Sequence, residues 1–129
     1  MKSLRLLVLS VLFFAGLLAS TAQAASFQAI DNDKDGTIDL SEVKAVASRR
    51  FDQLDRKRTG TLTRAQLGRL RVNRDEFAAA DPDNDGTLSK DEYLALVEKR
   101  FNALDSDHKG TLTLQQFNSR KALPLRRLL

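Results

Sequence analysis

The sequence of 129 residues is an internal duplication with an offset of 50 positions. The matched pairs include Phe27 and Phe77, Asp31 and Asp81, Gly36 and Gly86, Glu42 and Glu92, and Arg50 and Arg100. A repeat of this length constrains the fold, because each unit buries its apolar face against another. The chain is therefore expected to fold from two similar halves.

A second, looser repeat lies within each half. A Phe precedes an Asp by four residues, a Gly follows that Asp by five, and an aliphatic residue follows the Gly by two. The four copies begin at Asp31, Asp55, Asp81 and Asp105. Each Phe would lie one helical turn before its loop and point into a shared core. The aliphatic residues suit short extended pairing between loops, and they are Ile38, Leu62, Leu88 and Leu112.

The segments between loops have the spacing of helices. Residues 40–54 contain no Gly or Pro, and residues 90–104 repeat their apolar pattern at the same offset. Each segment is predicted to form one continuous helix that leaves one loop and enters the next. In the middle of the chain, Gly68 weakens a helix, while Asn73 and Glu76 suit an N-cap with a capping box. A bend is expected there.

Residues 31–42 match the twelve-residue calcium loop at each constrained position. Calcium is a hard cation that takes six to eight oxygen ligands at about 2.3 to 2.6 Å. The candidate direct ligands are the carboxylates of Asp31, Asp33, Asp35 and Glu42 and the backbone carbonyl of Thr37. Gly36 permits the sharp turn, because glycine takes positive φ at little cost. Asp39 would act through a water molecule.

Residues 81–92 repeat this pattern. The candidate direct ligands are Asp81, Asp83, Asp85 and Glu92 and the backbone carbonyl of Thr87. Ser89 takes the water position, and Pro82 occupies a position whose side chain is not a ligand. A bidentate glutamate favours calcium over the smaller magnesium, which demands an octahedral shell. Two matches predict two calcium ions; the alternative is a pair of acidic turns that bind nothing.

The other two loops lack the final glutamate. The differing positions are Lys57, Thr59 and Gln66 in residues 55–66, and Lys109 and Gln116 in residues 105–116. The two lysines are expected to neutralise the remaining aspartates and hold each loop closed without metal. The loop at 55–66 is predicted to be silent. Weak binding at 105–116 remains open, because that loop keeps Asp105 and Asp107.

These loops resemble those of EF-hand calcium-binding proteins, in particular the small secreted bacterial ones with closely spaced hands. The resemblance covers nearly all of residues 25–129 and implies an all-α domain of four helix-loop-helix units. Unlike calmodulin-like proteins, the chain has only a dozen residues between loops within a half. A helix of about 15 residues would hold its two loops about 22 Å apart. Pairing between the halves is therefore expected, with the partner of each loop left open.

The first 24 residues have the layout of a secretory signal peptide. Residues 1–5 carry two positive charges, residues 6–19 are almost wholly apolar, and Ala22-Gln23-Ala24 ends a small polar stretch. Cleavage after Ala24 is expected, with a periplasmic or secreted product. The apolar run of 14 residues is shorter than the roughly 20 that span a bilayer, so an uncleaved anchor is the alternative.

Composition limits the chemistry of the remaining 105 residues. Without cysteine, the chain has no disulfide, thiolate zinc site or cysteine nucleophile. The single histidine, His108, has no obvious catalytic constellation, so an enzyme is not expected. The absence of methionine beyond Met1 argues against a flexible groove that opens widely on calcium binding. The expected role is that of a calcium sensor or buffer.

Basic residues form two stretches. Nine lie between positions 49 and 74, against Asp52 and Asp55 alone. A solvated helical face is the simpler interpretation. The alternative is a structural module with permanently bound calcium that docks an acidic protein or an anionic membrane surface. Nucleic acid is not expected, because exposed aromatic residues are not interleaved. Residues 120–129, broken at Pro124, are expected to fray.

Overall fold

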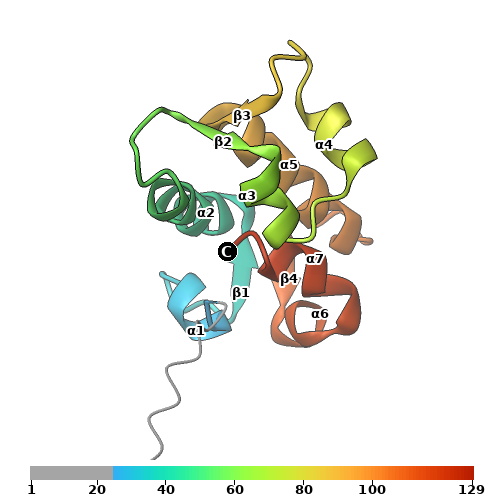
Figure 1. The fold of residues 1–129 in the computed structure, drawn as a ribbon. Helices are drawn as coiled ribbons and strands as arrows, with labels where there is room; N and C mark the ends of the chain where they lie inside the picture. Colours follow the sequence, from blue (N-terminus) through green and yellow to red (C-terminus); the bar gives the residue numbers. More distant parts are fainter. Residues whose placement is uncertain (1–24) are drawn as a thin grey trace, which may run out of the picture.

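Helices alternate with short strands through the computed structural model, which describes residues 25–129 (Figure 1). The elements are α1 (Phe27–Ile30), β1 (Thr37–Asp39), α2 (Leu40–Leu54), β2 (Thr61–Thr63), α3 (Arg64–Arg69), α4 (Arg74–Ala80), β3 (Thr87–Ser89), α5 (Lys90–Leu104), β4 (Thr111–Thr113), α6 (Leu114–Asn118), a 3-10 helix η1 (Arg120–Ala122) and α7 (Leu123–Arg126). The all-α expectation is thus correct for the helices, and the four three-residue strands lie where short extended pairing between loops was expected. The predicted signal peptide lies outside the described residues.

The two longest helices occupy the ranges predicted for them and join the halves. A capping box begins each helix, with Asp39 as the N-cap of α2 and Ser89 as the N-cap of α5. The helices pack antiparallel, because their two ion pairs occur in opposite order along the two helices. Lys44 Nζ lies 2.6 Å from Glu98 Oε2, and Lys90 Nζ lies 2.6 Å from Asp52 Oδ1.

Two small antiparallel sheets pair the loops across the halves. β1 pairs with β4, which sets Ile38 opposite Leu112, and β2 pairs with β3, which sets Leu62 opposite Leu88. All four side chains are fully buried. The expected pairing between halves is confirmed. The first loop meets the fourth and the second meets the third, so each loop with a complete ligand pattern pairs with one that lacks it.

The predicted bend divides the halves between α3 and α4. Arg71 takes a φ of +61°, and Asn73 caps α4 by accepting a hydrogen bond of 2.8 Å from Glu76 N. The N-cap prediction is confirmed, but the capping box is not formed. The Glu76 carboxylate instead accepts two hydrogen bonds of 2.7 Å from Arg100. A long-range ion pair has displaced a local bond.

The C-terminal segment is packed into the core, so the prediction of a frayed end is wrong. Leu125 and Leu128 are fully buried, and Tyr93 Oη donates a hydrogen bond of 2.6 Å to the Leu128 carbonyl. Pro124 lies in the first turn of α7, where a missing N–H costs nothing. Its carbonyl accepts a hydrogen bond from Arg100. The tail therefore closes the core against α5.

The four phenylalanines of the loop repeat are buried in the core, as predicted: Phe27, Phe51, Phe77 and Phe101. Contacts between aromatic rings reach across the halves. Phe51 meets Tyr93 edge-on at 5.6 Å between ring centroids, and Phe27 meets Phe117 at 6.0 Å. Within residues 25–129, no helix combines the length and apolarity needed to span a bilayer.

Candidate metal sites

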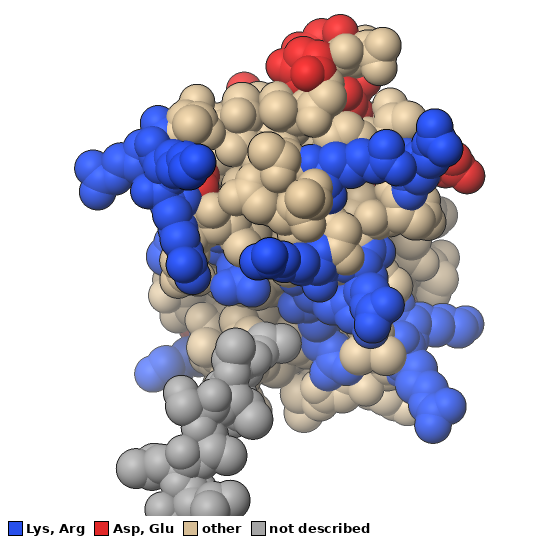
Figure 2. Space-filling model, in the orientation of Figure 1, with Lys and Arg blue, Asp and Glu red and all other residues tan. Residues whose placement is uncertain are grey.

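Three aspartates converge in each loop that has the complete ligand pattern. Each of Asp31, Asp33 and Asp35 offers a carboxylate oxygen, and these oxygens all lie within 4.8 Å of one another. Asp81, Asp83 and Asp85 form the same cluster in the second half. Figure 2 shows an acidic group at the top of the molecule, where Figure 1 places the loop between α4 and β3 that contains this second cluster. The structure thus brings together six of the ten predicted site residues as two triads.

The first aspartate of each loop is buried and organises the backbone around it. Asp31 Oδ1 and Oδ2 accept hydrogen bonds of 3.1 Å from the N–H groups of Asp35 and Gly36. Asp81 accepts the equivalent bonds from Asp85 at 3.2 Å and Gly86 at 3.0 Å. These bonds hold the backbone of each loop around its first aspartate, next to the other two carboxylates of the triad.

Two further positions of each loop are fixed by local hydrogen bonds. Thr37 donates its N–H and its hydroxyl to Asp35 Oδ1, both at 2.8 Å, and Thr87 does the same to Asp85 at 2.8 and 2.9 Å. Asp39 Oδ1 accepts a bond of 2.8 Å from Glu42 N. The sequence placed Asp39 at a water-mediated position, but its role as the N-cap of α2 was not foreseen.

The final glutamates of the two loops have different environments. Glu42 Oε1 accepts a bond of 2.7 Å from Asn32 N, and its Oε2 accepts one of 3.0 Å from Asp39 N. The Glu42 carboxylate therefore links the two ends of its loop. Glu92 Oε2 accepts a bond of 2.7 Å from Ser89 N, but Pro82, at the position of Asn32, has no N–H to donate.

The pKa values of the aspartates reflect their crowding. A hydrogen bond with Asp81 is the main cause that raises the pKa of Asp83. Burial acts to raise the pKa of Asp81, but hydrogen bonds with Asp83 and with the N–H groups of the loop outweigh it and lower the pKa. The pKa of Asp33 is raised: a backbone hydrogen bond from Asp35 lowers it, but burial and the charges of Asp35 and Glu42 prevail.

The donor atoms of both clusters suit a hard divalent cation. All the gathered side-chain donors are carboxylate oxygens, with no sulfur or imidazole among them, and such donor sets favour calcium or magnesium over zinc or copper. Like charges held this close repel one another, so a cation between them would relieve the repulsion.

The loops without a final glutamate are closed by hydrogen bonds. Gln66 Nε2 donates to the Leu54 carbonyl at 2.9 Å, and Gln116 Nε2 donates to the Leu104 carbonyl at 3.5 Å. Each glutamine ties the end of its loop to the residue just before its start. These amide donors occupy the position of the missing glutamate, and the sequence pattern did not reveal their role.

The expected closure by lysine is correct in only one of these loops. Lys109 Nζ lies 3.4 Å from Asp107 Oδ2. Lys57 is exposed, and Asp55 instead accepts bonds from Thr59 N, Thr59 Oγ1 and Gly60 N at 2.9, 3.0 and 2.7 Å. Burial acts to raise the pKa of Asp55, but these bonds outweigh it and lower the pKa. A neutral threonine thus replaces the predicted ammonium.

Comparison with known families agrees with this geometry. Residues 23–47 match the EF hand family model, and residues 71–100 match the model of an EF-hand domain pair. No curated protein matches the chain. The two matched segments contain the two aspartate triads, each in a loop between helices. The chain belongs to the EF-hand family of calcium-binding proteins.

Proposed function

We propose that the protein binds two calcium ions, one in residues 31–42 and one in residues 81–92. The proposed ligands are the carboxylates of Asp31, Asp33, Asp35 and Glu42 with the Thr37 carbonyl, and the carboxylates of Asp81, Asp83, Asp85 and Glu92 with the Thr87 carbonyl. One observation carries this proposal: each loop holds three carboxylate oxygens within 4.8 Å on a backbone already folded around its first aspartate.

Isothermal titration calorimetry tests the stoichiometry. The protein should bind two ions, and Glu42→Ala and Glu92→Ala should each remove one, because each deletes two of the oxygens in a calcium shell. Gln66→Ala and Gln116→Ala are the matched controls and should remove none. A stoichiometry of four, or a Glu92→Ala protein that still binds two ions, would show that the ligands are wrongly assigned.

The four loops are proposed to belong to four EF hands, arranged as a duplication of one pair. Each calcium-binding hand is supported by a hand that binds no metal. Support comes from the strands, because β4 backs the first loop and β2 backs the third. Calcium should then stabilise the folded state by mass action, by about 2.7 kcal/mol per site at a hundredfold excess over Kd. Thermal melting in calcium and in chelator measures this shift, and identical curves would contradict the proposal.

Export is the second element of the proposal. The layout of residues 1–24 supports a cleaved signal peptide and a periplasmic or secreted product. N-terminal sequencing of the exported fraction should begin at Ala25 or within about two residues of it. A product that retains Met1 and sediments with membranes would contradict cleavage.

A closed form with calcium bound is favoured over a sensor that opens widely. Tyr93, Leu125 and Leu128 are fully buried where the tail meets α5, and residues 25–129 contain no methionine. Opening this core would break the Tyr93 hydrogen bond and expose the leucines. An apolar fluorescent dye should therefore gain little signal on addition of calcium. A large signal would indicate a sensor with a newly exposed groove.

Docking of an acidic partner is a second candidate function, and one observation favours it. Figure 2 shows Lys and Arg side chains spread across the middle of one face, with few acidic side chains among them. In this role calcium would hold the scaffold while the basic surface recognises the partner. An anionic membrane surface is the competing target for the same charge.

A further inference from the structure

The two basic stretches of the sequence meet at one cavity of about 670 Å³. Its walls include six arginines, from α2, the α3 end and the tail: Arg49, Arg50, Arg69, Arg71, Arg126 and Arg127. No acidic residue lines the cavity, and Val46 and Leu70 contribute buried apolar surface to it. Cavities of this size accommodate small ligands or short peptide segments.

These arginines have no carboxylate partners within residues 25–129. None of the six takes part in the ion pairs of that part of the chain. Among the described residues, the Arg50 side chain makes one hydrogen bond, a long one of 3.5 Å to Gln53 Oε1. Arg126 lies 5.8 Å above the Phe117 ring, and its buried Nε has no hydrogen-bond partner among the described residues. The cavity therefore concentrates guanidinium groups whose donors are available to an outside acceptor.

The duplication shows which acceptor this environment suits. Arg100, the counterpart of Arg50, is held by both carboxylate oxygens of Glu76 at 2.7 Å. The counterpart of Glu76 in the first half is Ser26, which supplies no carboxylate. Arg100 is thus paired with a glutamate of the same chain, whereas Arg50 has no glutamate at the equivalent position.

The cavities beside the two arginines are also counterparts. Ala29, Val46 and Arg49 line the large one. Their equivalents at the offset of 50, Ala79, Leu96 and Lys99, line a cavity of about 170 Å³ that also contains Glu76. The small cavity has two glutamates in its wall, Glu76 and Glu92, whereas no Asp or Glu side chain lines the large one.

We infer that the large cavity binds an acidic segment of a partner protein through its carboxylates, with an apolar side chain against Val46 and Leu70. This inference rests on the docking role proposed above and not on calcium binding. The Glu76–Arg100 pair is the internal example of the contact, since guanidinium groups bind carboxylates through paired hydrogen bonds. A recessed site admits a peptide, whereas the plane of lipid headgroups would meet a flat or convex face.

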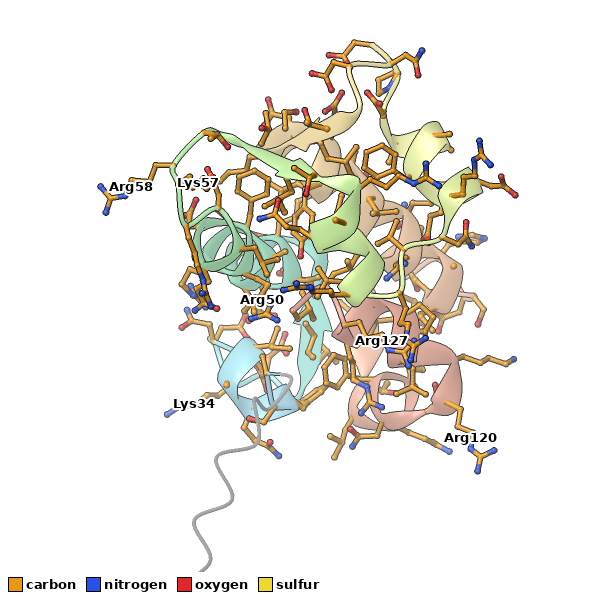
Figure 3. The ribbon with its side chains drawn as sticks, in the orientation of Figure 1. Lys34, Arg50, Lys57, Arg58, Arg120 and Arg127 are labelled. Atoms are coloured by element: carbon orange, nitrogen blue, oxygen red, sulfur yellow. The ribbon has the colours of Figure 1, made fainter. Side chains whose placement is uncertain are left out.

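The orientation of the labelled side chains supplies matched variants. In Figure 3, Arg50 and Arg127 lie near the middle of the molecule, where α2 and the tail meet, whereas Arg58 and Arg120 project from its edges. Arg50 and Arg127 line the cavity, and Arg58 and Arg120 do not. Replacing any one of the four by methionine removes the same charge, so the variants separate the site from the overall charge.

The test is fluorescence anisotropy with a labelled glutamate-rich peptide that carries one leucine, in saturating calcium. Arg50→Met and Arg127→Met should each raise Kd about tenfold, the effect of losing one charge-assisted hydrogen bond. Arg58→Met and Arg120→Met should change Kd less than about twofold, because exposed charges contribute little. The same peptide with glutamine in place of glutamate should not bind.

Three results would overturn the inference. Equal losses in all four variants would mean that overall charge, not the cavity, attracts the peptide. Binding to phosphatidylglycerol vesicles without binding to the peptide would identify a membrane surface as the target. Failure to bind either probe would remove the docking role itself. Calcium stoichiometry, measured on the same samples, shows whether calcium binding stands independently of these outcomes.

Discussion

The two halves of the molecule share a backbone plan but are completed in different ways. Each has a long capped helix that begins at its aspartate-rich loop. In the second half, Glu76 and the tail cover Arg100 on α5. In the first half, Arg50 on α2 borders an open cavity. Equivalent arginines thus have unequal roles, because Ser26, at the position equivalent to Glu76, supplies no carboxylate.

The largest expected effect is a difference in stability between two single variants, which carry the same substitution at equivalent positions of α5 and α2. Arg100→Met should lower the free energy of unfolding by about 3 kcal/mol, because it breaks a largely buried ion pair and leaves its partners unpaired. Arg50→Met should cost less than about 1 kcal/mol, since it breaks no ion pair in residues 25–129. Urea unfolding in saturating calcium measures both values.

Equal losses in these two variants would break the comparison between the halves. They would mean that Arg50 has a structural partner equivalent to Glu76, and the cavity could not then offer that arginine to a ligand. If Arg100→Met instead left the free energy of unfolding unchanged, the stability of the second half would come from apolar packing and not from this ion pair.

A smaller effect is expected at the contact between the tail and α5. Tyr93→Phe removes the only hydroxyl that bonds the Leu128 carbonyl among the described residues, and a buried acceptor left unpaired costs about 2 kcal/mol. The burial that raises the pKa of Tyr93 keeps this hydroxyl protonated as a donor. Urea unfolding reports the loss. A neutral substitution with fast amide exchange in residues 123–129 would show that the tail frays.

Lowering the pH should weaken the Glu76–Arg100 contact. The hydrogen bonds from Arg100 are the main cause that lowers the pKa of Glu76 below its ordinary value of 4.5, although burial opposes them. A carboxyl whose pKa is lower in the folded state stabilises that state above the ordinary pKa. The contribution is lost as the pH falls through the lowered pKa. The stability advantage of the wild type over Arg100→Met should therefore shrink below about pH 4.5. An advantage independent of pH would contradict this assignment.

Local sequence patterns predicted the elements whose causes are local or repeated. The apolar spacing of residues 40–54 and 90–104 predicted both long helices, and the aliphatic residue two positions after each loop glycine predicted the small sheets. The aspartate triads also followed from spacing alone, because alternate positions of a tight loop point inward. Which loop pairs with which could not follow, since all four loops carry the same aliphatic signal.

The failures at the capping box, the tail and the cavity share one physical cause, which is competition from partners distant in sequence. Asn73 and Glu76 have the spacing of a capping box, but Arg100, 24 residues away, takes the Glu76 carboxylate. The leucines and arginines of residues 120–129 suggested a mobile end. The sequence does not show that two side chains of α5, Tyr93 and Arg100, donate hydrogen bonds to the backbone carbonyls of this tail. The cavity remained hidden for the same reason, since its two basic stretches meet only in the fold.

The smallest expected effect is on the calcium affinity of the two complete loops. They differ at their second position, where the first loop has Asn32 and the third has Pro82. Proline restricts φ, so the metal-free third loop has fewer conformations to lose on binding. Pro82→Ala should release about 0.4 to 1 kcal/mol of this restriction and raise the Kd of that site about two- to fivefold. Calorimetry in a Glu42→Ala background isolates the third loop.

Asn32→Ala in a Glu92→Ala background is the matched control. It keeps the N–H that donates to Glu42, so the Kd of the first loop should not change. Equal weakening in both loops would attribute the effect to the general loss of a side chain. A tighter third site in Pro82→Ala would mean that the new N–H, by reaching Glu92 as Asn32 N reaches Glu42, outweighs the lost rigidity.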